Sequence, residues 1–290
     1  MKILDGLKTS QAIKKDIAAE VKKLVKKGKK RPHLAAVLVG DNGASITYVN
    51  AKIKDCEEVG FKSSLVKLPE TTTQEELLKH IDTLNNNADL DGYIVQLPLP
   101  KHIDEQTIKL AINPKKDVDG FHPENIGRLV LGLPSFLPAT PYGIIKLLEH
   151  YKIETSGKHT VVIGRSQIVG SPLSILMARN SKQGNSTVTL THSRTKNLKK
   201  LTLQADIIVA ALGKTEFLTA DMVKEGAIVI DVGITRVKST KTKSGWKILG
   251  DVKFDEVAEK CSYITPVPGG VGPMTRAGLL LNTLQSVLMK

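Results

Sequence analysis

The sequence predicts an α/β protein of two domains, and three observations support that prediction. Short β-branched and apolar segments alternate with amphipathic ones along the chain, as in parallel sheets covered by helices. Some of the strand segments, such as residues 33–40, are apolar throughout, which is typical of strands buried on both faces. At residues 160–172 a β-branched run ends at Gly164 and an apolar helix follows. A length of 290 residues fits about two domains.

In the first half of the chain we expect helices and strands to alternate. A helix that Gly28 stops is followed by a buried strand, and Ser45 is expected to cap the next helix, which ends before Gly60. The expected order is helix 7–27, strand 33–40, helix 45–59, strand 64–68, helix 73–87, strand 91–97 and helix 103–111. This alternation predicts an α/β layer around a parallel sheet.

In the second half, residues 113–138 have no strong periodicity and are expected to form a long ordered connection. The further elements expected are helix 141–151, strand 160–163 and its helix, strands 186–191, 206–211, 227–232 and 263–265, a surface hairpin at 238–250, a Gly/Pro loop at 266–273 and helix 275–289. We therefore expect a catalytic domain at 1–140, completed by a helix at 275–290, and a Rossmann-type domain at 141–274, with a cleft between them.

The net charge of +13 raises the possibility of nucleic-acid binding. The densest basic run, residues 22–31, lies on a segment whose apolar residues Ile13, Ile17, Val21 and Leu24 have helical spacing, so its lysines fall mostly on a solvated face. We therefore favour a solvated helix and expect no nucleic-acid partner. The positive balance could instead attract an anionic small substrate.

Membrane, secretory and metal-binding classes are not favoured. No window holds 18 apolar residues, and the first residues lack the apolar core of a signal peptide. The two cysteines, Cys56 and Cys261, are far apart, and the seven histidines are scattered, so we expect a reduced cytoplasmic location and no catalytic metal.

The glycine turn after the strand at 160–163 resembles the start of a dinucleotide-binding unit. Its spacing is Gly164, Ser166, Gly170, so a serine replaces the middle glycine of the usual G-x-G-x-x-G and the last glycine is displaced by one. A glycine turn that only packs a helix on a strand is the alternative.

The residues that follow the next strand indicate which dinucleotide the protein binds. Residues 192–195, His-Ser-Arg-Thr, contain no carboxylate to accept the ribose 2′-hydroxyl of NAD. Arg165 and Ser193 would instead bind a 2′-phosphate, with Arg194 as a further candidate. The sequence thus predicts NADP over NAD, and the alternative is that Arg194 and His192 only face water.

Polar residues in the first half form a second set of candidates. Tyr48 and Lys52 are four residues apart on one helix face, and we interpret Cys56 on that face as packing. Gln96 ends a buried strand, where open α/β sheets bind ligands. Asp119 precedes a glycine. Each has an ordinary alternative: a lysine covering a ring, a glutamine bonding loop backbone, or an aspartate of a turn.

Taken together, these motifs resemble the bifunctional methylenetetrahydrofolate dehydrogenase/methenyltetrahydrofolate cyclohydrolase family. Six motifs in order support the resemblance, from Gly6 to Asn282: residues 48–52 (YVNAK), 95–100 (VQLPLP), 116–121 (KDVDGF), 164–170 (GRSQIVG), 231–234 (DVGI) and 265–275. Each is weak alone, and all six in order are specific.

The resemblance implies two reactions on one substrate. 5,10-Methylenetetrahydrofolate gives a hydride to NADP, and water then opens the methenyl product to 10-formyltetrahydrofolate, which supplies one-carbon units for purine and related biosynthesis. It also implies a homodimer formed through the cofactor domain.

The resemblance also implies roles for individual residues. Lys52 would act in the cyclohydrolase step with Gln96, Tyr48 would position the folate, and Asp119 would hold the pterin. The implied folate site further includes Val95, Leu97, Pro268, Gly269, Gly270, Val271 and Gly272. The implied cofactor site comprises Gly164, Arg165, Ser166, Ser193 and, on the nicotinamide side, Ile234.

Two other functions remain as alternatives. One is another NADP-dependent two-domain dehydrogenase acting on a small hydroxy or amino acid, which would not need Tyr48, Gln96 and Asp119 together. The other is a nucleic-acid-binding module that uses the basic N-terminal helix.

Overall fold

The computed structural model describes residues 1–240, 242 and 245–289, and the chain forms two compact units. Unit 1 consists of residues 1–10 and 140–275, and unit 2 of residues 11–139 together with the segment that begins at Arg276. Residues 1–10 belong to unit 1 because β1 (Lys2–Ile3) pairs in parallel with β11 (Tyr263–Ile264). The catalytic domain expected at 1–140 includes these residues, because a two-residue strand leaves no signal in the sequence.

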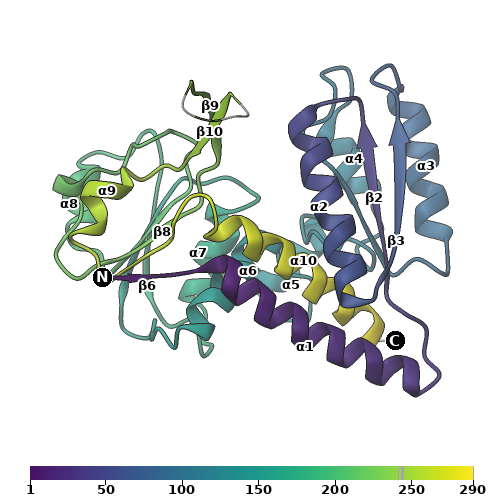
Figure 1. Cartoon of the computed structure of the whole chain (residues 1–290), viewed down its shortest axis with the longest axis horizontal. Helices are drawn as coiled ribbons and strands as arrows, with labels where there is room; N and C mark the ends of the chain where they lie inside the picture. The colour runs from purple at the N-terminus through teal and green to yellow at the C-terminus, as the bar shows by residue number, and fades with distance from the viewer. Residues whose placement is uncertain (241, 243–244, 290) are drawn as a thin grey trace. The chain divides into compact units, whose positions relative to one another are not determined.

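Unit 2 is a three-layer α/β structure around the parallel sheet β3-β2-β4 (Figure 1). Its strands are β2 (His33–Val39), β3 (Lys62–Leu68) and β4 (Gly92–Val95). Its helices are α1 (Gly6–Lys26, from Gln11), α2 (Gly43–Val59), α3 (Gln74–Asn86), α4 (Glu105–Ala111), α5 (Pro123–Val130) and the part of α10 (Val271–Leu288) from Arg276. The expected alternation of helix and strand is confirmed.

The central strand β2 is buried along its whole length, as its apolar sequence predicted. Leu34, Ala36 and Leu38 pack in one hydrophobic core with α1, α2 and α10. The alternate residues, Ala35 and Val37 among them, pack in a second core with α3 and α4. Side chains of a strand alternate between the faces of a sheet, so one strand supplies both cores.

Two expectations for unit 2 were wrong in detail. Asn42, not Ser45, caps α2, because its side-chain oxygen accepts the N–H groups of Ala44 and Ser45 at 3.0 and 3.1 Å. The connection at 113–138 contains α5, which begins at Pro123 and is capped by the His122 side chain. Pro123 in the first turn of this helix is an ordinary start signal.

Unit 1 contains a six-stranded parallel sheet in the order β1-β11-β8-β7-β5-β6 (Figure 1). The further strands are β5 (His159–Ile163), β6 (Thr187–Thr191), β7 (Ile207–Ala210) and β8 (Ile228–Asp231), and α6 (Ala139–His150) precedes them. The strand β5 has β6 on one side and β7 on the other, so the strand order reverses at β5. In open α/β sheets such a reversal marks the ligand crevice, at the carboxyl ends of the strands.

The remaining elements of unit 1 are short. They are α7 (Gly170–Ala178), α8 (Leu198–Thr202), the 3₁₀ helix η1 (Ala220–Met222), α9 (Phe254–Ala258) and the antiparallel pair β9 (Thr235–Lys238) and β10 (Trp246–Leu249). The pair β9–β10 confirms the expected hairpin, and residues 241, 243 and 244 in its connection lie outside the described residues. The expected Gly/Pro loop is shorter than predicted, because α10 already begins at Val271.

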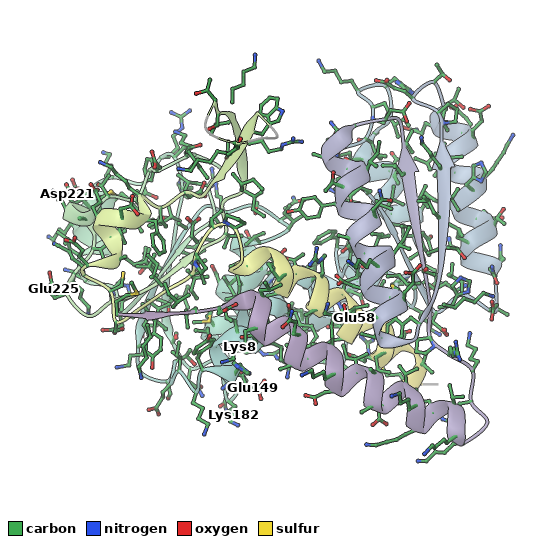
Figure 2. The ribbon with its side chains drawn as sticks, viewed as in Figure 1. Lys8, Glu58, Glu149, Lys182, Asp221 and Glu225 are labelled. Atoms are coloured by element: carbon green, nitrogen blue, oxygen red, sulfur yellow. The ribbon has the colours of Figure 1, made fainter. Side chains whose placement is uncertain are left out.

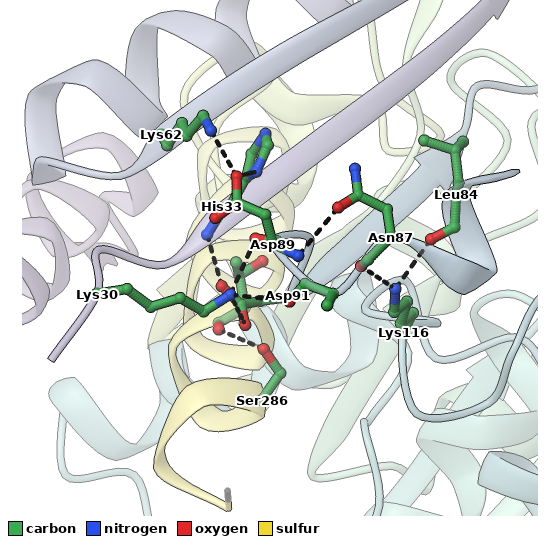
Figure 3. A network of polar contacts seen from close by, with 11 residues as sticks. Lys30, His33, Lys62, Leu84, Asn87, Asp89, Asp91, Lys116 and Ser286 are labelled. Carbon is green, nitrogen blue, oxygen red and sulfur yellow. Dashed lines mark hydrogen bonds and ion pairs between the residues drawn. The ribbon is translucent and has the colours of Figure 1, made fainter.

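A polar network lies at the amino end of the unit 2 sheet (Figure 3). The backbone N–H of His33 donates to Asp91 at 2.9 Å, and Lys30 pairs with the same carboxylate at 3.0 Å. The His33 ring contacts Ser64 Oγ through Nε2 at 2.7 Å and Asp89 through Nδ1 at 3.1 Å. These bonds join the starts of all three strands.

Unit 1 has a matching network at the amino end of its sheet. The backbone N–H of His159, the first residue of β5, donates to Asp206 at 2.8 Å, and Lys224 pairs with this carboxylate at 2.6 Å. The ring Nε2 of His159 contacts Thr189 Oγ1 at 2.9 Å on the neighbouring strand. The register is also the same, because Ala35 pairs with Ser64 and Val161 with Thr189, each two residues after its histidine.

Across the residues that the structure describes, none of the helices combines the length and apolar character that a membrane crossing needs. Within the same residues, the His, Cys, Asp and Glu side chains form no group of three that could hold a metal ion.

Candidate active site and cofactor site

The first candidate site centres on Lys52 and Gln96 in unit 2. Lys52 lies on α2, and its Nζ donates to Gln96 Oε1 at 3.1 Å. Gln96 directly follows β4, and its backbone N–H donates to Val37 O at 2.9 Å. The side-chain Nε2 of Gln96 donates to the carbonyl of Leu97 at 2.7 Å, which directs Oε1 toward Lys52. The structure therefore brings together two residues that lie 44 positions apart in the chain.

The surroundings of Lys52 favour its neutral form. Burial lowers the pKa of the Lys52 amine below its ordinary value. The Asp119 carboxylate opposes this effect on the pKa, and the Arg276 guanidinium adds to it. A lysine whose amine is readily neutral can accept a proton, as general base catalysis requires.

Arg276 is a residue of this site that the sequence analysis missed. It lies in the unit 2 part of α10, and its Nε is 2.8 Å from Asp55 Oδ2 on α2. Lys14 pairs with the other Asp55 oxygen at 3.1 Å and with Glu58 at 2.6 Å, and Figure 2 shows Glu58 on α2 beside α1. A signal existed, because Arg276 is the one charged residue in the sequence of α10.

Asp117 and Asp119 have different surroundings although they are two residues apart. Asp117 is buried, and it accepts the backbone N–H of His122 at 2.7 Å and the side chain of Asn125 at 3.0 Å. Burial, together with the nearby Asp119 charge, raises the pKa of Asp117 to about 6 although those two hydrogen bonds lower it. Asp119 is only partly buried, and burial raises its pKa while Lys52 opposes that shift. Asp117 therefore organises the loop, and Asp119 is the carboxyl available to a ligand.

Tyr48 and Cys56 occupy the same helix face as Lys52. Burial raises the pKa of the Tyr48 hydroxyl, and Arg276 partly offsets this, so the phenol stays a neutral hydrogen-bonding group. Cys56 is fully buried in the core, and burial raises the pKa of its thiol to about 12. The interpretation of Cys56 as packing is therefore confirmed, since a nucleophilic cysteine needs a readily formed thiolate.

Val95, Leu97 and Asp119 line a small cavity in unit 2 of about 20 Å³, which is room for one water molecule. Its wall also includes Tyr93 and Phe121. These three predicted substrate-binding residues therefore border the same cavity of unit 2.

The second candidate site is the glycine turn between β5 and α7 in unit 1. Gly164 has φ +113°, and a Cβ at this position would lie 2.1 Å from the carbonyl oxygen of Ala211. A Cβ on Gly170 would lie 1.8 Å from the carbonyl oxygen of Gly164. Both positions therefore require glycine. Ser166, in place of the usual middle glycine, accepts the N–H groups of Val169 and Gly170 at 3.2 and 3.4 Å and so closes the turn itself.

Arg165 and Ser193 follow neighbouring strand ends. Ile163 pairs with Thr191, and the N–H of Gly164 donates to Thr191 O at 2.9 Å. Arg165 and Ser193 are each two residues beyond this pair, and both are exposed, as is Arg194. His192 to Thr195 form a tight turn in which the N–H of Thr195 donates to His192 O at 2.8 Å. The exposed side chains of Arg165, Arg194 and Ser193 at this edge of the sheet can therefore bind an anion.

The remaining predicted residues also lie in unit 1. Ile234 follows β8 and is 44% exposed, and Gly272 lies next to it. Pro268, Gly269 and Gly270 precede α10, whereas Val271 and Gly272 form its first turn. These residues therefore belong to a different unit from Tyr48, Lys52, Gln96 and Asp119.

The fold and the two sites define a class: a two-unit α/β oxidoreductase with a dinucleotide-type sheet in one unit and a lysine-containing polar site in the other. Residues 4–119 match the family model described as the tetrahydrofolate dehydrogenase/cyclohydrolase catalytic domain. Residues 138–290 match the NAD(P)-binding domain of the same family. The chain belongs to the tetrahydrofolate dehydrogenase/cyclohydrolase family, which confirms the resemblance inferred from the motifs.

Individual relatives support this family membership. The chain is 67% identical to the bifunctional protein FolD of Cytophaga hutchinsonii over 290 residues, 100% of both chains. It is 65% identical to that of Flavobacterium johnsoniae, over 100% of this chain and 98% of the other. The crystal structure of the bifunctional FolD enzyme of Campylobacter jejuni superposes with a TM-score of 0.93 at 50% identity, covering 100% of this chain and 99% of that one.

A more distant structure also matches with a TM-score of 0.93, at 37% identity, over 98% of this chain and 96% of the other. It is the Trypanosoma brucei methylenetetrahydrofolate dehydrogenase-cyclohydrolase complexed with NADP and an inhibitor. The chain is thus an enzyme with dehydrogenase and cyclohydrolase activities and an NAD(P)-binding domain.

Proposed function

We propose that the enzyme oxidises 5,10-methylenetetrahydrofolate with NADP and hydrolyses the 5,10-methenyl product to 10-formyltetrahydrofolate, with Lys52 as the proton-transfer group of the second step. The observation that carries the residue assignment is the Lys52 amine, whose pKa burial lowers and whose N–H is bonded to Gln96 Oε1 at 3.1 Å. The supply of one-carbon units for purine synthesis follows as a metabolic role of the product.

The hydrolysis uses the amine as a base. Gln96 accepts one N–H of the neutral amine, which leaves the nitrogen lone pair for a water molecule. The water oxygen bonds to the methenyl carbon as Lys52 takes its proton. The lysine then returns a proton to N5 as the bond from that carbon to N5 breaks. The remaining hydroxyl proton leaves to solvent as the C=O bond forms, which leaves the formyl group on N10. The cationic substrate itself disfavours a charged lysine beside it, so the neutral form is favoured further.

The pterin is assigned to Asp119, with Tyr48 positioning the folate. A pterin presents an N–H and an amino group side by side, and a carboxylate accepts both. The partly exposed Asp119 can do this, whereas the buried Asp117 already uses its oxygen for His122 and Asn125. Val95, Leu97 and residues 268–272 are proposed as the rest of the folate site.

The residues at the glycine turn fit NADP. The close approach of backbone at Gly164 and Gly170 forms the turn that a pyrophosphate needs beside a helix N-terminus. Arg165 and Ser193, with Arg194 near them, are assigned to the 2′-phosphate, and Ile234 to the nicotinamide side. When bound, the nicotinamide accepts the hydride from the methylene carbon. The protein's part is to bind and orient the two partners of this transfer.

The direct test is to measure NADPH formation from methylenetetrahydrofolate, with NAD in a parallel reaction. Turnover with NADP well above that with NAD is expected. Absence of turnover with the folate would overturn the proposal and favour the alternative, a two-domain dehydrogenase acting on a small hydroxy or amino acid. Hydrolysis of added methenyltetrahydrofolate, followed by its absorbance, tests the second activity separately.

We also infer a cytoplasmic homodimer with no nucleic-acid partner. Cys56 and Cys261 are buried free thiols, as in a reducing compartment. Light scattering after size exclusion would show a mass twice that of the 31.5 kDa chain, and a monomer would contradict the inference. Tight, salt-sensitive binding to random-sequence DNA near physiological salt would contradict the absence of a nucleic-acid partner.

A further inference from the structure

Two buried carboxyl groups in unit 1, Asp231 and Asp251, join the turns at one side of the sheet. Asp231 ends β8, and its Oδ1 accepts the N–H groups of Gly233 and Asp251, both at 2.9 Å. Its Oδ2 accepts the N–H of Val252 at 3.0 Å. The backbone N–H of Asp231 donates to Thr265 Oγ1 at 2.7 Å. One side chain thus joins the end of β8 to the segment after β10.

Asp251 continues this connection to the neighbouring strand. Its Oδ2 accepts the N–H groups of Leu212 and Gly213 at 2.7 and 2.9 Å, in the turn that follows β7. The other oxygen, Oδ1, is buried without a hydrogen-bond partner among the described residues. A Cβ on Gly233 would lie 2.4 Å from this oxygen, so the turn after β8 packs directly against the Asp251 carboxyl group.

The turn after β7 lies next to the glycine turn, and the end of β8 bonds to β7 through the N–H of Val232, which donates to Ala210 O at 2.9 Å. The N–H of Ala211 donates to Ile163 O at 2.8 Å, and Gly164 packs against the Ala211 carbonyl. The segments after β7 and β8 are therefore at the carboxyl side of the sheet, on the side of β5 away from Ser193. Ligands of open α/β sheets bind at this edge. If Arg165 and Ser193 hold the adenosine side, these turns face the nicotinamide side.

We propose that Asp231 and Asp251 are positioning residues that hold the turns at Leu212–Gly213 and Gly233–Ile234 against the nicotinamide half of the cofactor. The inference rests on the proposed NADP-dependent function. It implies that dehydrogenase activity depends on the pair, whereas the hydrolysis step, whose proton-transfer residues Lys52 and Gln96 lie in unit 2, does not.

The pair also gives the cofactor site a pH dependence. Burial raises the pKa of Asp231 to about 6, and the Asp251 charge adds to that effect while its three N–H bonds lower the pKa. Asp231 borders a cavity of about 330 Å³, which gives protons a path to it. The charged groups that face it are Asp251 and the cavity residues Glu216, Lys247, Lys253, Asp255 and Glu256. Protonation below about pH 6 turns an acceptor oxygen into a hydroxyl and weakens the connection.

The first experiment compares the two activities in Asp251→Ala and Asp251→Asn. Asp251→Ala removes the acceptor of two N–H groups, so the KM for NADP is expected to rise roughly 10-fold. Hydrolysis of added methenyltetrahydrofolate should stay within about twofold of wild type, since Lys52 and Gln96 lie in unit 2 and keep their contact. Asp251→Asn keeps a carbonyl oxygen for both N–H groups and should restore most of the cofactor affinity.

Asp206→Ala is the matched control, since it removes an N–H acceptor at the opposite end of the same sheet. It should lower the melting temperature without changing the ratio of the two activities. An unchanged KM for NADP in Asp251→Ala would overturn the proposal, and so would an equal loss of both activities. Absence of dehydrogenase activity in the wild type would instead overturn the proposed function.

The second experiment is a pH profile of the KM for NADP. In the wild type the KM should rise as the pH falls through about 6. Asp231→Asn carries an amide in place of the protonated acid, so its KM should be high throughout and show no such change. The titration of the NADP phosphate is common to both proteins and cancels in the comparison. The same acid limb in both proteins would overturn the role of Asp231.

Discussion

In both units a histidine begins a parallel strand that has a neighbour on each side, and an aspartate just before one of those neighbours accepts its backbone N–H. His33 and Asp91 do this in unit 2, and His159 and Asp206 do it in unit 1, each at 2.8 to 2.9 Å. At the carboxyl ends the two sheets differ. The unit 2 sheet ends at Gln96 beside Lys52, and the unit 1 sheet ends in glycine turns beside exposed cations. The amino edges join the starts of the strands, and the carboxyl edges hold the proposed sites.

The largest expected effect is at the unit 2 carboxyl edge. Lys52→Met removes the proton-transfer group and should lower the rate of methenyltetrahydrofolate hydrolysis by about 10²- to 10⁴-fold. Part of the NADP-dependent oxidation should remain, because hydride transfer does not need this proton acceptor. The two rates are measured separately by absorbance. Hydrolysis at the wild-type rate would show that Lys52 has no catalytic role.

At the unit 1 carboxyl edge, Arg165→Ala should weaken NADP binding by roughly 1.5–3 kcal/mol, or about 10- to 150-fold, through the loss of a charged hydrogen bond to the 2′-phosphate. NAD binding should be nearly unchanged. Titration calorimetry with both nucleotides measures the difference, and Lys200→Ala, also an exposed cation of unit 1, controls for net charge. An equal loss for both nucleotides would contradict the phosphate assignment.

The amino edges should respond in stability and not in activity. Asp91 is 1% exposed, so Asp91→Ala leaves the buried His33 N–H without its acceptor and should cost about 1–3 kcal/mol of unfolding free energy. Asp206→Ala should cost about 1 kcal/mol or less, because that carboxylate is 34% exposed. Urea denaturation measures both values. Loss of specific activity in the folded variants would contradict the prediction that the amino edges affect stability and not activity.

The Asp206 variant also has a pH signature. The Lys224 ammonium and the His159 N–H hold the pKa of Asp206 below its ordinary value. The stabilisation is therefore present above about pH 4 and is lost as the pH falls, so wild type and Asp206→Ala should converge in stability at acid pH.

The smallest effect concerns the pH dependence of the unit 2 site. Arg276 lowers the pKa of Lys52, so Arg276→Met should raise that pKa and move the rising limb of the hydrolysis profile to higher pH. Arg276→Lys keeps the positive charge and should leave the limb in place. A shift of the Arg276→Met limb to lower pH would have the wrong sign for this electrostatic effect.

Much of the fold could be predicted because its signals are local. The apolar run of β2 and the glycines that end helices specify elements by themselves. The helices α8 and α9 have five residues each, too few for a periodic pattern, and so they were missed. The α5 helix was missed because its eight residues make only about two turns inside a segment rich in Pro and Gly.

The site residues also differ in whether a local sequence signal identifies them. Lys52 and Gln96 were found from helix spacing and strand position, and their contact follows from the sheet. Arg276 was missed because its partner Asp55 lies 221 residues earlier in the chain, and only the tertiary fold brings them together. Asp231 is part of the DVGI motif, but its connection to Asp251 was missed because the bonds of both carboxylates go to backbone N–H groups, which leave no trace in residue type.

The α10 helix has a consequence for how the protein is made. Its residues Leu279, Leu280 and Leu284 are part of the same core as β2, and Asn282 donates to the carbonyls of Val118 and Leu137 at 2.8 and 2.7 Å. A ribosome translates this helix only after all the strands of both sheets. The nascent segment 11–139 therefore leaves the ribosome with an uncovered apolar surface, which stays open to chaperones until unit 1 has been synthesised.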